Sequence, residues 1–346
     1  MSELREFRIA TFNLFNLVLP EVRYYGSRRY KPDEFIRKRD WLAAQLARMN
    51  AEIVGFQEVF HHEALKQVID VNGLYPGATI LTNERFEADT GQPLPANGLV
   101  TRFPVVESSV VTNFPDAAKV SYDGLPVPVT EFSRPVLRAK LRLTDTLELL
   151  VLVAHLKSKR PMIDEEREDK SDPVVQALGR ARSLIRRAAE AVALRAVLVE
   201  SLRETRLPVV VLGDMNDSVS AVTSEIMAGA PPWRFLPREQ KEAIWDVLLY
   251  NVKDIQARRS YVDVYFTHIF NGHYDALDHI LVSEEWVREN PDHVGQVVNV
   301  RVYNDHIVDE TLALDDVPNW QSDHGQVVAE IRLRRPRAPI PPPTPA

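Results

Sequence analysis

The sequence predicts an α/β protein whose buried strands end at one rim of a sheet sandwich. The clearest strand is 209–212, a continuous apolar run of β-branched residues and leucine, as in strands buried on both faces. An amphipathic helical pattern over 178–203 leads directly into it. The composition, 45% hydrophobic and 26% charged over 346 residues, provides for a sizeable core. We expect one domain over 1–335 and a Pro-rich disordered tail over 336–346.

In the first half of the chain, strand and helix patterns alternate. A helix over 32–50 has apolar residues at helical spacing, and Asp33 can cap it. Apolar alternation with turn signals over 75–111 predicts short antiparallel strands. The other expected elements are a strand at 8–13, a strand at 51–58, a helix over 61–74 and a half-exposed strand at 133–143.

In the second half, buried runs again alternate with helices. The helix over 178–203 is expected to bury one stripe of side chains, namely Ala181, Leu184, Ile185, Ala188, Val192 and Val199. Asn271-Gly272 after a strand-like stretch at 261–270 is a hairpin signal. The other expected elements are strands at 147–154, 276–283 and 326–333 and a helix over 239–249.

Polar side chains recur where these strands end. The strand at 209–212 runs through Gly213, where the backbone can turn freely, into Asp214 and Asn216. Taken alone, that stretch also suits an Asx-rich turn. The complete set of strand-end residues is Asn13, Glu58, His155, Asp214 with Asn216, Asp278, and Asp323 with His324. Polar groups at a core rim need partners, so we expect these residues to form one site.

The chemistry of this set indicates a metal-assisted reaction on a phosphoester. Carboxylate and amide oxygens favour Mg²⁺ or Mn²⁺ over zinc. His155 is followed by Lys157, Lys159 and Arg160, and Arg134 lies on another strand, so cations are available for phosphate. A divalent ion, a group that holds water and cations for phosphate are the components of phosphoester hydrolysis.

Six motifs, in order, resemble those of the endonuclease/exonuclease/phosphatase superfamily, which has the DNase I-like fold. They are TFNLFNL, IVGFQEV, AHLKSKR, VVVLGDMND, ALDHILVS and SDH, and the match covers nearly the whole chain, from Ile9 to Ile331. The resemblance implies a four-layer α/β sandwich, with two mixed β-sheets packed face to face and helices outside.

The resemblance also implies a role for each strand-end residue. Glu58 would be the principal metal ligand, with Asn13 beside it and Asp323 adding a carboxylate. Phe15 stands where apurinic-site members carry an acid, which puts a metal position there in doubt. The remaining residues would handle water and phosphate: Asp214 would orient or deprotonate the water, Asn216 would position water and phosphate, His155 would bond a phosphate oxygen, His324 would face the phosphate, and Asp278 would fix the ring of His324.

The motifs resemble most closely those of bacterial extracellular-type nucleases. Inositol phosphatases carry Tyr-Arg after the Gly-Asp-x-Asn motif and Cys-Asp-Arg at the Asp strand, whereas this chain has Asp217-Ser218 and Leu277-Asp278-His279. We therefore expect an endonuclease acting on DNA or RNA, with nucleic acid as its partner. The alternatives are a metal-dependent phosphatase or phosphodiesterase acting on a small phosphoester or a phospholipid headgroup, and a binding module that has lost the chemistry.

Charge and composition exclude several other classes. A net charge of −7 argues against a basic nucleic-acid arm, so phosphate must be met locally or through a metal. The absence of cysteine excludes disulfides, thiolate zinc sites and cysteine nucleophiles. No apolar run approaches the ~20 residues of a membrane span, and no signal peptide is visible, so a cytoplasmic location is expected. Two similar-looking pairs, Asp305-His306 and His61-His62, are not expected in the site.

Overall fold

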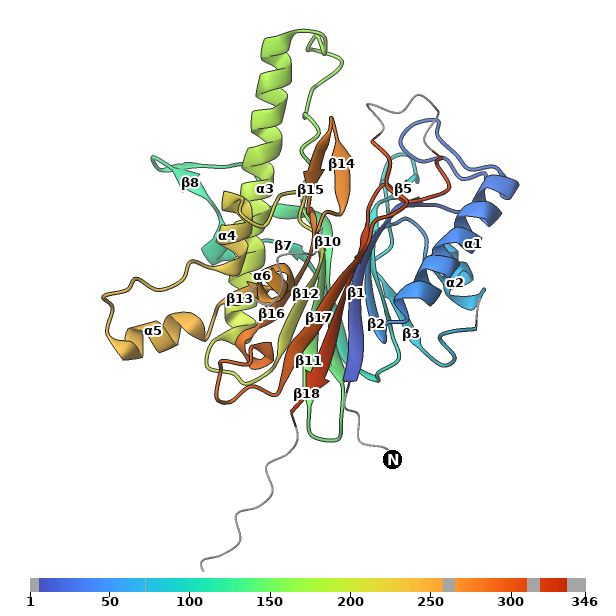
Figure 1. Cartoon of the computed structure of the whole chain (residues 1–346). Coiled ribbons are helices and arrows are strands. Elements are labelled where there is room, and N and C mark those ends of the chain that lie inside the picture. The colour runs from blue at the N-terminus through green and yellow to red at the C-terminus, as the bar shows by residue number, and fades with distance from the viewer. Residues whose placement is uncertain (1–5, 72, 258–264, 310–317, 335–346) are drawn as a thin grey trace, which may run out of the picture.

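A computed structural model describes residues 6–71, 73–257, 265–309 and 318–334. Within them two mixed sheets pack face to face with helices outside, as the family resemblance implied (Figure 1). The first sheet has the order β17 (Gly295–Tyr303), β18 (Gln326–Leu333), β1 (Glu6–Leu17), β2 (Ile53–Val59), β6 (Ala96–Thr101) and β3 (Thr79–Thr82). The second has the order β13 (Leu249–Asn251), β16 (Asp278–Ser283), β12 (Val209–Asp214), β11 (Glu148–His155), β10 (Glu131–Arg142) and β7 (Val105–Asn113).

Helices and small hairpins complete the described chain. Its helices are α1 (Pro32–Met49), α2 (His62–Asp70), α3 (Pro173–Leu202), α4 (Val222–Ala228), α5 (Arg238–Trp245) and α6 (Val252–Ala257). The two-stranded pairs are β4 (Arg85–Phe86) with β5 (Pro93–Leu94), β8 (Ser121–Tyr122) with β9 (Leu125–Pro126), and β14 (His268–Phe270) with β15 (His273–Asp275). No helix in the described residues is long and apolar enough to cross a bilayer.

Each sheet contains one parallel pair, and a helix makes each crossover. α1 returns the chain from β1 to β2, and α3 returns it from β11 to β12. The other strand pairs within the two sheets are antiparallel. Both parallel pairs therefore present their carboxyl ends at one rim, between the two sheets.

The core between the sheets is apolar and closely packed. Ile9 and Ile53 of the first sheet belong to one buried cluster with Val153 and Leu212 of the second. A Cβ atom added at Gly55 would lie 2.9 Å from the Cβ of Leu212, so the sheets approach closely there. Two further clusters lie outside this core, one under α1 and α2 and the other under α3. The three buried clusters therefore separate four layers, namely the two sheets and the helices outside each of them.

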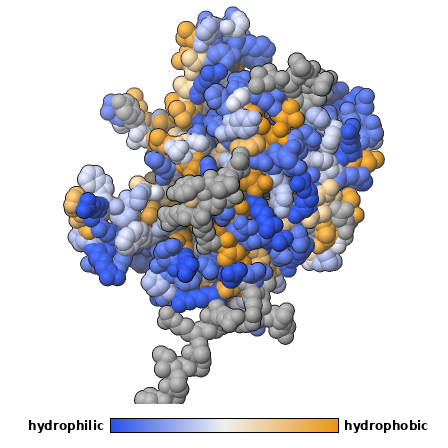
Figure 2. All heavy atoms as spheres, viewed as in Figure 1, coloured by the Kyte–Doolittle hydropathy of each residue, from blue (hydrophilic) through white to orange (hydrophobic). Residues whose placement is uncertain are grey.

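The long helix α3 differs from its sequence-based description. It begins at Pro173, where the side chain of Asp172 accepts hydrogen bonds from the first turn. The predicted buried stripe was wrong: Ala181, Leu184 and Ile185 are exposed, and Ala188, Val192 and Val199 are only partly buried. The buried face instead includes Gly179, Ser183 and Arg187. The N-terminal half of α3 extends past the sheet, and apolar side chains remain on its surface (Figures 1 and 2).

Smaller differences concern element ends. Lys31 is the N-cap of α1, and its backbone N–H is bonded by Glu34, so Asp33 is not the cap. α2 ends at Asp70, four residues before the predicted end. The Asn271-Gly272 hairpin is confirmed, with both residues in the left-handed region. The stretch 261–264 and the tail 336–346 lie outside the described residues.

Candidate active site

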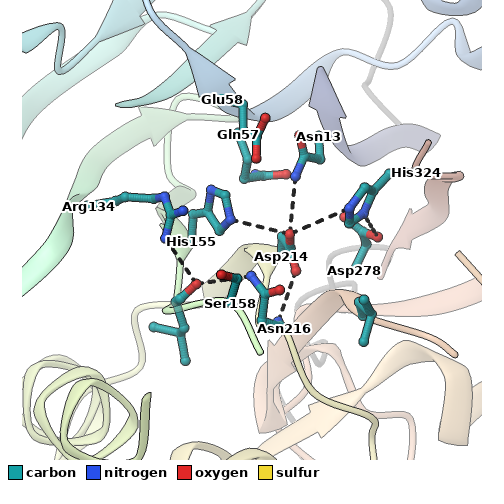
Figure 3. A network of polar contacts seen from close by, with 12 residues as sticks. Asn13, Gln57, Glu58, Arg134, His155, Ser158, Asp214, Asn216, Asp278 and His324 are labelled. Atoms are coloured by element: carbon teal, nitrogen blue, oxygen red, sulfur yellow. Dashed lines mark hydrogen bonds and ion pairs between the residues drawn. The ribbon is translucent and has the colours of Figure 1, made fainter. Parts of the chain in front are cut away.

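The strand-end residues meet at the shared rim of the two sheets (Figure 3). In the second sheet, register places Asp214 directly between His155 and Asp278. In the first sheet, Asn13 is paired with Gln57, next to Glu58. Adjacent strands therefore bring together residues that lie up to 311 positions apart, as Asn13 and His324 do. The predicted residues therefore lie together at one rim. They do not all end strands, however: Asn13 lies within β1, Asp278 begins β16, and Asp323 and His324 precede β18.

Asp214 is the centre of the polar network. Its Oδ2 accepts a hydrogen bond from Asn13 Nδ2 at 3.1 Å and lies 3.3 Å from His155 Nε2. Its Oδ1 accepts the backbone N–H of Asn216 at 2.9 Å. The carboxylate is 1% exposed, and burial raises the pKa of Asp214, while nearby His324 acts in the opposite direction. Asn13 thereby links the first sheet to the second at this carboxylate.

Gly213 serves a different purpose from the turn expected at that position. It lies within β12, and its φ is not positive. A Cβ atom there would overlap the carbonyl group of Ala154 on β11. Glycine is needed because β11 and β12 approach closely just before His155 and Asp214.

His324 and Asp278 form a buried pair. His324 Nδ1 lies 2.8 Å from Asp278 Oδ2, and His324 Nε2 faces Asp214 Oδ2 at 3.9 Å. Burial alone would lower the pKa of His324, but the two carboxylates outweigh it and raise that pKa well above its usual value. These carboxylates favour the protonated ring, whose Nδ1 faces Asp278 and whose Nε2 faces the site.

His155 is in the opposite electrostatic state. Burial, assisted by the Arg134 guanidinium, places the pKa of His155 well below its usual value. Its Nε2 lies 3.3 Å from Asp214 Oδ2, so a neutral ring with its proton on Nε2 would direct that proton toward the carboxylate. Its Nδ1 is buried without a hydrogen-bond partner among the described residues.

Glu58 lies at the end of β2, on the side of the site nearest Asn13 (Figure 3). Its Oε2 accepts the backbone N–H of Asn16 at 2.9 Å. Burial raises the pKa of Glu58, and Arg134 is the strongest opposing influence. Asp323, immediately before His324, has a buried Oδ1 without a hydrogen-bond partner in the described chain. The oxygens of Glu58 and Asp323 can accept more hydrogen bonds than the described protein groups donate to them.

The backbone around the site is held in unusual conformations. Phe15, Asn16, Glu58 and Asn216 all have positive φ, between 49° and 62°. Side chains of the site stabilise three of these turns: Asn13 bonds the N–H of Phe15, Glu58 that of Asn16, and Asp214 that of Asn216. Non-glycine residues in the left-handed region carry backbone strain, so these hydrogen bonds hold conformations that cost conformational free energy.

The four expected phosphate-binding cations have different surroundings. Lys159 lies 3.6 Å from Asp217 and 3.6 Å from Asp275, so its charge is largely matched. Lys157 is half buried and bonds backbone carbonyls, and burial lowers its pKa to about 8. Arg160 is exposed, and Arg134 donates to the carbonyl of Leu156 at 3.3 Å beside His155.

Sequence patterns missed two residues at the site. Lys38 on α1 is fully buried and donates to the carbonyl groups of Phe15 at 2.8 Å and Asn319 at 3.3 Å. A lysine in an amphipathic helix is normally expected to face solvent, so its sequence position did not indicate burial. Asn16 has a buried Oδ1 with no partner in the described residues, next to Glu58. Asn16 is the second asparagine of the Asn-x-x-Asn spacing in the first motif, and that spacing was the available signal.

The two pairs that sequence analysis excluded have other partners. Asp305 forms an ion pair with Arg48. His306 Nε2 lies 3.0 Å from the carbonyl oxygen of His324, and its ring packs on Trp41. His61 accepts the backbone N–H of Leu19. These contacts support the fold around the site.

The family model described as Endonuclease/Exonuclease/phosphatase matches residues 10–324. The chain belongs to that family. Its members are phosphoester hydrolases that depend on a divalent metal, and the carboxylate and histidine cluster described above agrees with this. No curated protein matches the chain in sequence.

Solved structures resemble the whole chain at low identity. The human Nocturnin catalytic domain with bound sulfate has a TM-score of 0.54 and 16% identity, covering 96% of each chain. An endonuclease/exonuclease/phosphatase family protein from Bacteroides thetaiotaomicron has 0.52 and 17%, covering 95% of this chain and 98% of that chain. D. rerio TDP2 with a single-strand DNA product has 0.52 and 14%, covering 94% and 99%. At these identities the likeness shows the fold alone.

Proposed function

We propose that this family member is a divalent-metal-dependent phosphodiesterase that cuts DNA or RNA by in-line attack of water. The observation that carries the proposal is the convergence of Asn13, His155 and cationic His324 on the buried carboxylate of Asp214. A carboxylate for water and a cation for the phosphate face each other across one rim. The DNA product in the TDP2 structure supports nucleic acid as a substrate class for this fold.

The residues fit a hard divalent ion such as Mg²⁺ or Mn²⁺. We assign Glu58, Asn13 and Asp323 as its ligands, and Asn16 as a further candidate. Asp323 Oδ1 and Asn16 Oδ1 are buried oxygens without hydrogen-bond partners among the described residues, and the carboxylate of Glu58 is desolvated. When bound, the ion would polarise a phosphoryl oxygen and offset negative charge.

The chain's own residues then supply the remaining steps. Asp214 orients the attacking water and takes its proton, and Asn216 holds the turn beside that carboxylate. His324 donates from Nε2 to the phosphoryl group as negative charge develops, while Asp278 keeps the ring oriented. The expected bond from His155 to phosphate requires its N–H to leave Asp214, so its present partner favours a role in positioning Asp214.

Phosphate contacts beyond the metal would come from Arg134, Lys157 and Arg160. Lys159 is the weakest candidate because two carboxylates flank it. With few free cations and a net charge of −7, binding is expected to be moderate and salt-dependent. No element of the described residues resembles a base-reading helix, so little sequence preference is expected.

The test offers matched DNA and RNA strands to the purified chain with Mg²⁺ or Mn²⁺, with EDTA as the control. We expect internal cuts that require the metal. Calorimetry should show weaker Mg²⁺ or Mn²⁺ binding for Glu58→Gln, and unchanged binding for Glu63→Gln on the exposed face of α2. Intact nucleic acids together with inorganic phosphate released from small phosphoesters would establish the phosphatase alternative instead. No hydrolysis of either kind would favour a binding module.

A further inference from the structure

His268, on the β14–β15 hairpin, lies against the active-site histidine. Its ring centroid is 5.1 Å from that of His324. One ligand atom from each of His268, Asp323 and His324 lies within 4.8 Å of the others. In Figure 1 the hairpin projects at the same end of the sheets as the N-terminal half of α3. None of the six family motifs contains His268, so it is an addition to the set described above.

The backbone fixes these three residues relative to one another. The N–H of Gly325 donates to the carbonyl of Thr267 at 2.7 Å, so one hydrogen bond joins the residues adjacent to His324 and His268. The hydroxyl of Thr267 accepts the N–H groups of Leu277 and Asp278 at 2.9 and 3.1 Å. The hairpin is thereby anchored to the strand that carries Asp278, and His268 is held on rigid structure.

Two of the three facing groups are free to accept a ligand, and the third, His324 Nε2, would do so by releasing its proton to solvent. Asp323 Oδ1 is buried without a hydrogen-bond partner, and the His268 ring has none either, among the described residues. The His324 side chain is 9% exposed, and Asp278 occupies its Nδ1, which leaves Nε2 toward the cluster. Its distance to Asp323 Oδ1 is 4.0 Å. Tetrahedral zinc ligands lie roughly 3.3 Å apart, so small side-chain rotations would close the set.

We propose that His268, Asp323 and His324 form a second metal site, one that takes a borderline transition ion of the Zn²⁺ class. Two imidazoles and one carboxylate are ligands that zinc prefers, whereas Mg²⁺ prefers the oxygen set around Glu58. Asp278 on the far nitrogen of His324 is the outer partner that metal-binding histidines usually have. A water completes the fourth position.

Occupation of this site inhibits the reaction, a consequence that rests on the proposed function. An ion on Nε2 of His324 would displace the Nε2 proton to solvent, and would thereby remove the N–H that donates to the phosphoryl group. It also takes Asp323 from the ligands of the catalytic metal. The chain would therefore be active with Mg²⁺ and inhibited by Zn²⁺ at the same rim.

The binding test titrates the full chain with Zn²⁺ in saturating Mg²⁺, by calorimetry. His268→Asn should weaken Zn²⁺ binding by at least about tenfold, as expected when a ligand is lost. His273→Asn is the matched control, because His273 lies exposed on the other strand of the same hairpin. In parallel, Co²⁺ should give visible bands of a nitrogen-ligated site in the wild type and in His273→Asn only. Equal Zn²⁺ affinity in all three proteins would overturn the site.

A second variant and an activity assay separate the possible failures. His268→Gln should reproduce the effect, with circular dichroism showing that both variants are folded. In the cleavage assay, Zn²⁺ should inhibit the wild type at a concentration at least about tenfold lower than that needed for His268→Asn. Zn²⁺ binding that depends on His268 without nucleic-acid cleavage supports the site and contradicts the proposed function. Cleavage with Zn²⁺ binding that is indifferent to His268 does the reverse.

Discussion

At the scale of single residues, burial sets the chemistry of this rim. His155 and His324 lie on either side of Asp214, yet burial lowers the pKa of His155 whereas two carboxylates raise the pKa of His324. Such opposed environments are how acid and base roles are assigned to neighbouring groups. Asp214 and Lys38 are the two residues at which this reasoning is most easily tested.

Asp214→Asn should lower kcat by roughly 10²–10⁴-fold and leave KM nearly unchanged. The amide keeps the shape of the side chain but cannot take a proton from water. Steady-state kinetics on the best cleaved substrate measures both constants. Asp275→Asn is the control, because Asp275 is partly exposed on β15 and pairs with Lys159. A raised KM with kcat retained would mean that Asp214 contributes uniform binding only.

The titration of Lys38 should make the free energy of unfolding depend on pH between about 7 and 10.5. Burial lowers the pKa of Lys38 from 10.5 to about 7, although Asp323 and Glu58 oppose this. Between these values the unfolded chain holds one proton more than the folded chain, so the free energy of unfolding rises with pH. Lys38→Met should remove up to about 1.4 kcal/mol per pH unit of that rise. Urea unfolding in EDTA at about pH 7 and about pH 9 measures it. Parallel changes in both proteins would show that Lys38 does not titrate there.

At the scale of elements, α3 supports the site through one buried carboxylate. Both oxygens of Glu190 accept backbone N–H groups, from Ser133 at 2.8 Å and from Lys157 at 2.7 Å. These segments carry Arg134 and the cations after His155. A helix far from the reacting atoms thus joins β10 to the loop that follows β11.

Glu190→Gln should loosen one of these two segments. A glutamine has a single acceptor oxygen, so one buried N–H loses its partner, at about 1–3 kcal/mol of stability. Hydrogen exchange should become faster at the amide of Ser133 or Lys157. Glu200→Gln, at an exposed position of the same helix, is expected to leave both amides protected. Unchanged protection in Glu190→Gln would remove Glu190 from this supporting role.

At the scale of the whole molecule, the site depends on how closely the two sheets pack. Asn13 lies in the first sheet and His324 just before its strand β18, whereas their partners Asp214 and Asp278 lie in the second sheet. Gly55 is where the sheets approach most visibly, against Leu212 and Val153. Any separation of the sheets would also lengthen the contacts at the rim.

Gly55→Ala should therefore destabilise the fold by about 1–3 kcal/mol, as overpacked cores do. The added Cβ would lie 2.9 Å from Leu212 Cβ, an atom that cannot move without its strand. Chemical denaturation measures the loss. Ser109→Ala on the exposed face of β7 should stay within about 0.5 kcal/mol of the wild type. A Gly55→Ala protein as stable as the wild type would show that the interface relaxes freely.

The sequence by itself determined the alternation of strands and helices and the polar residues that lie in or next to the buried strands. These are local signals: apolar runs, caps and turns depend on near neighbours in the chain. β18 begins and ends where predicted, and the hairpin at Asn271-Gly272 forms as its turn chemistry requires. The resemblance carried by six motifs then implied the four layers, and the structure confirms them.

Only the tertiary structure decided which residues face one another and in what charge state. Leu184 and Ile185 follow helical spacing but stay exposed, because α3 outruns the sheet that would cover them. The buried ammonium of Lys38 donates to two carbonyl groups from segments distant in sequence, so its burial depends on the tertiary fold. His155 and His324 are the same residue type in the sequence. Their opposite pKa shifts arise from burial and from carboxylates on neighbouring strands. Burial and electrostatics depend on the whole packed molecule, which no local pattern encodes.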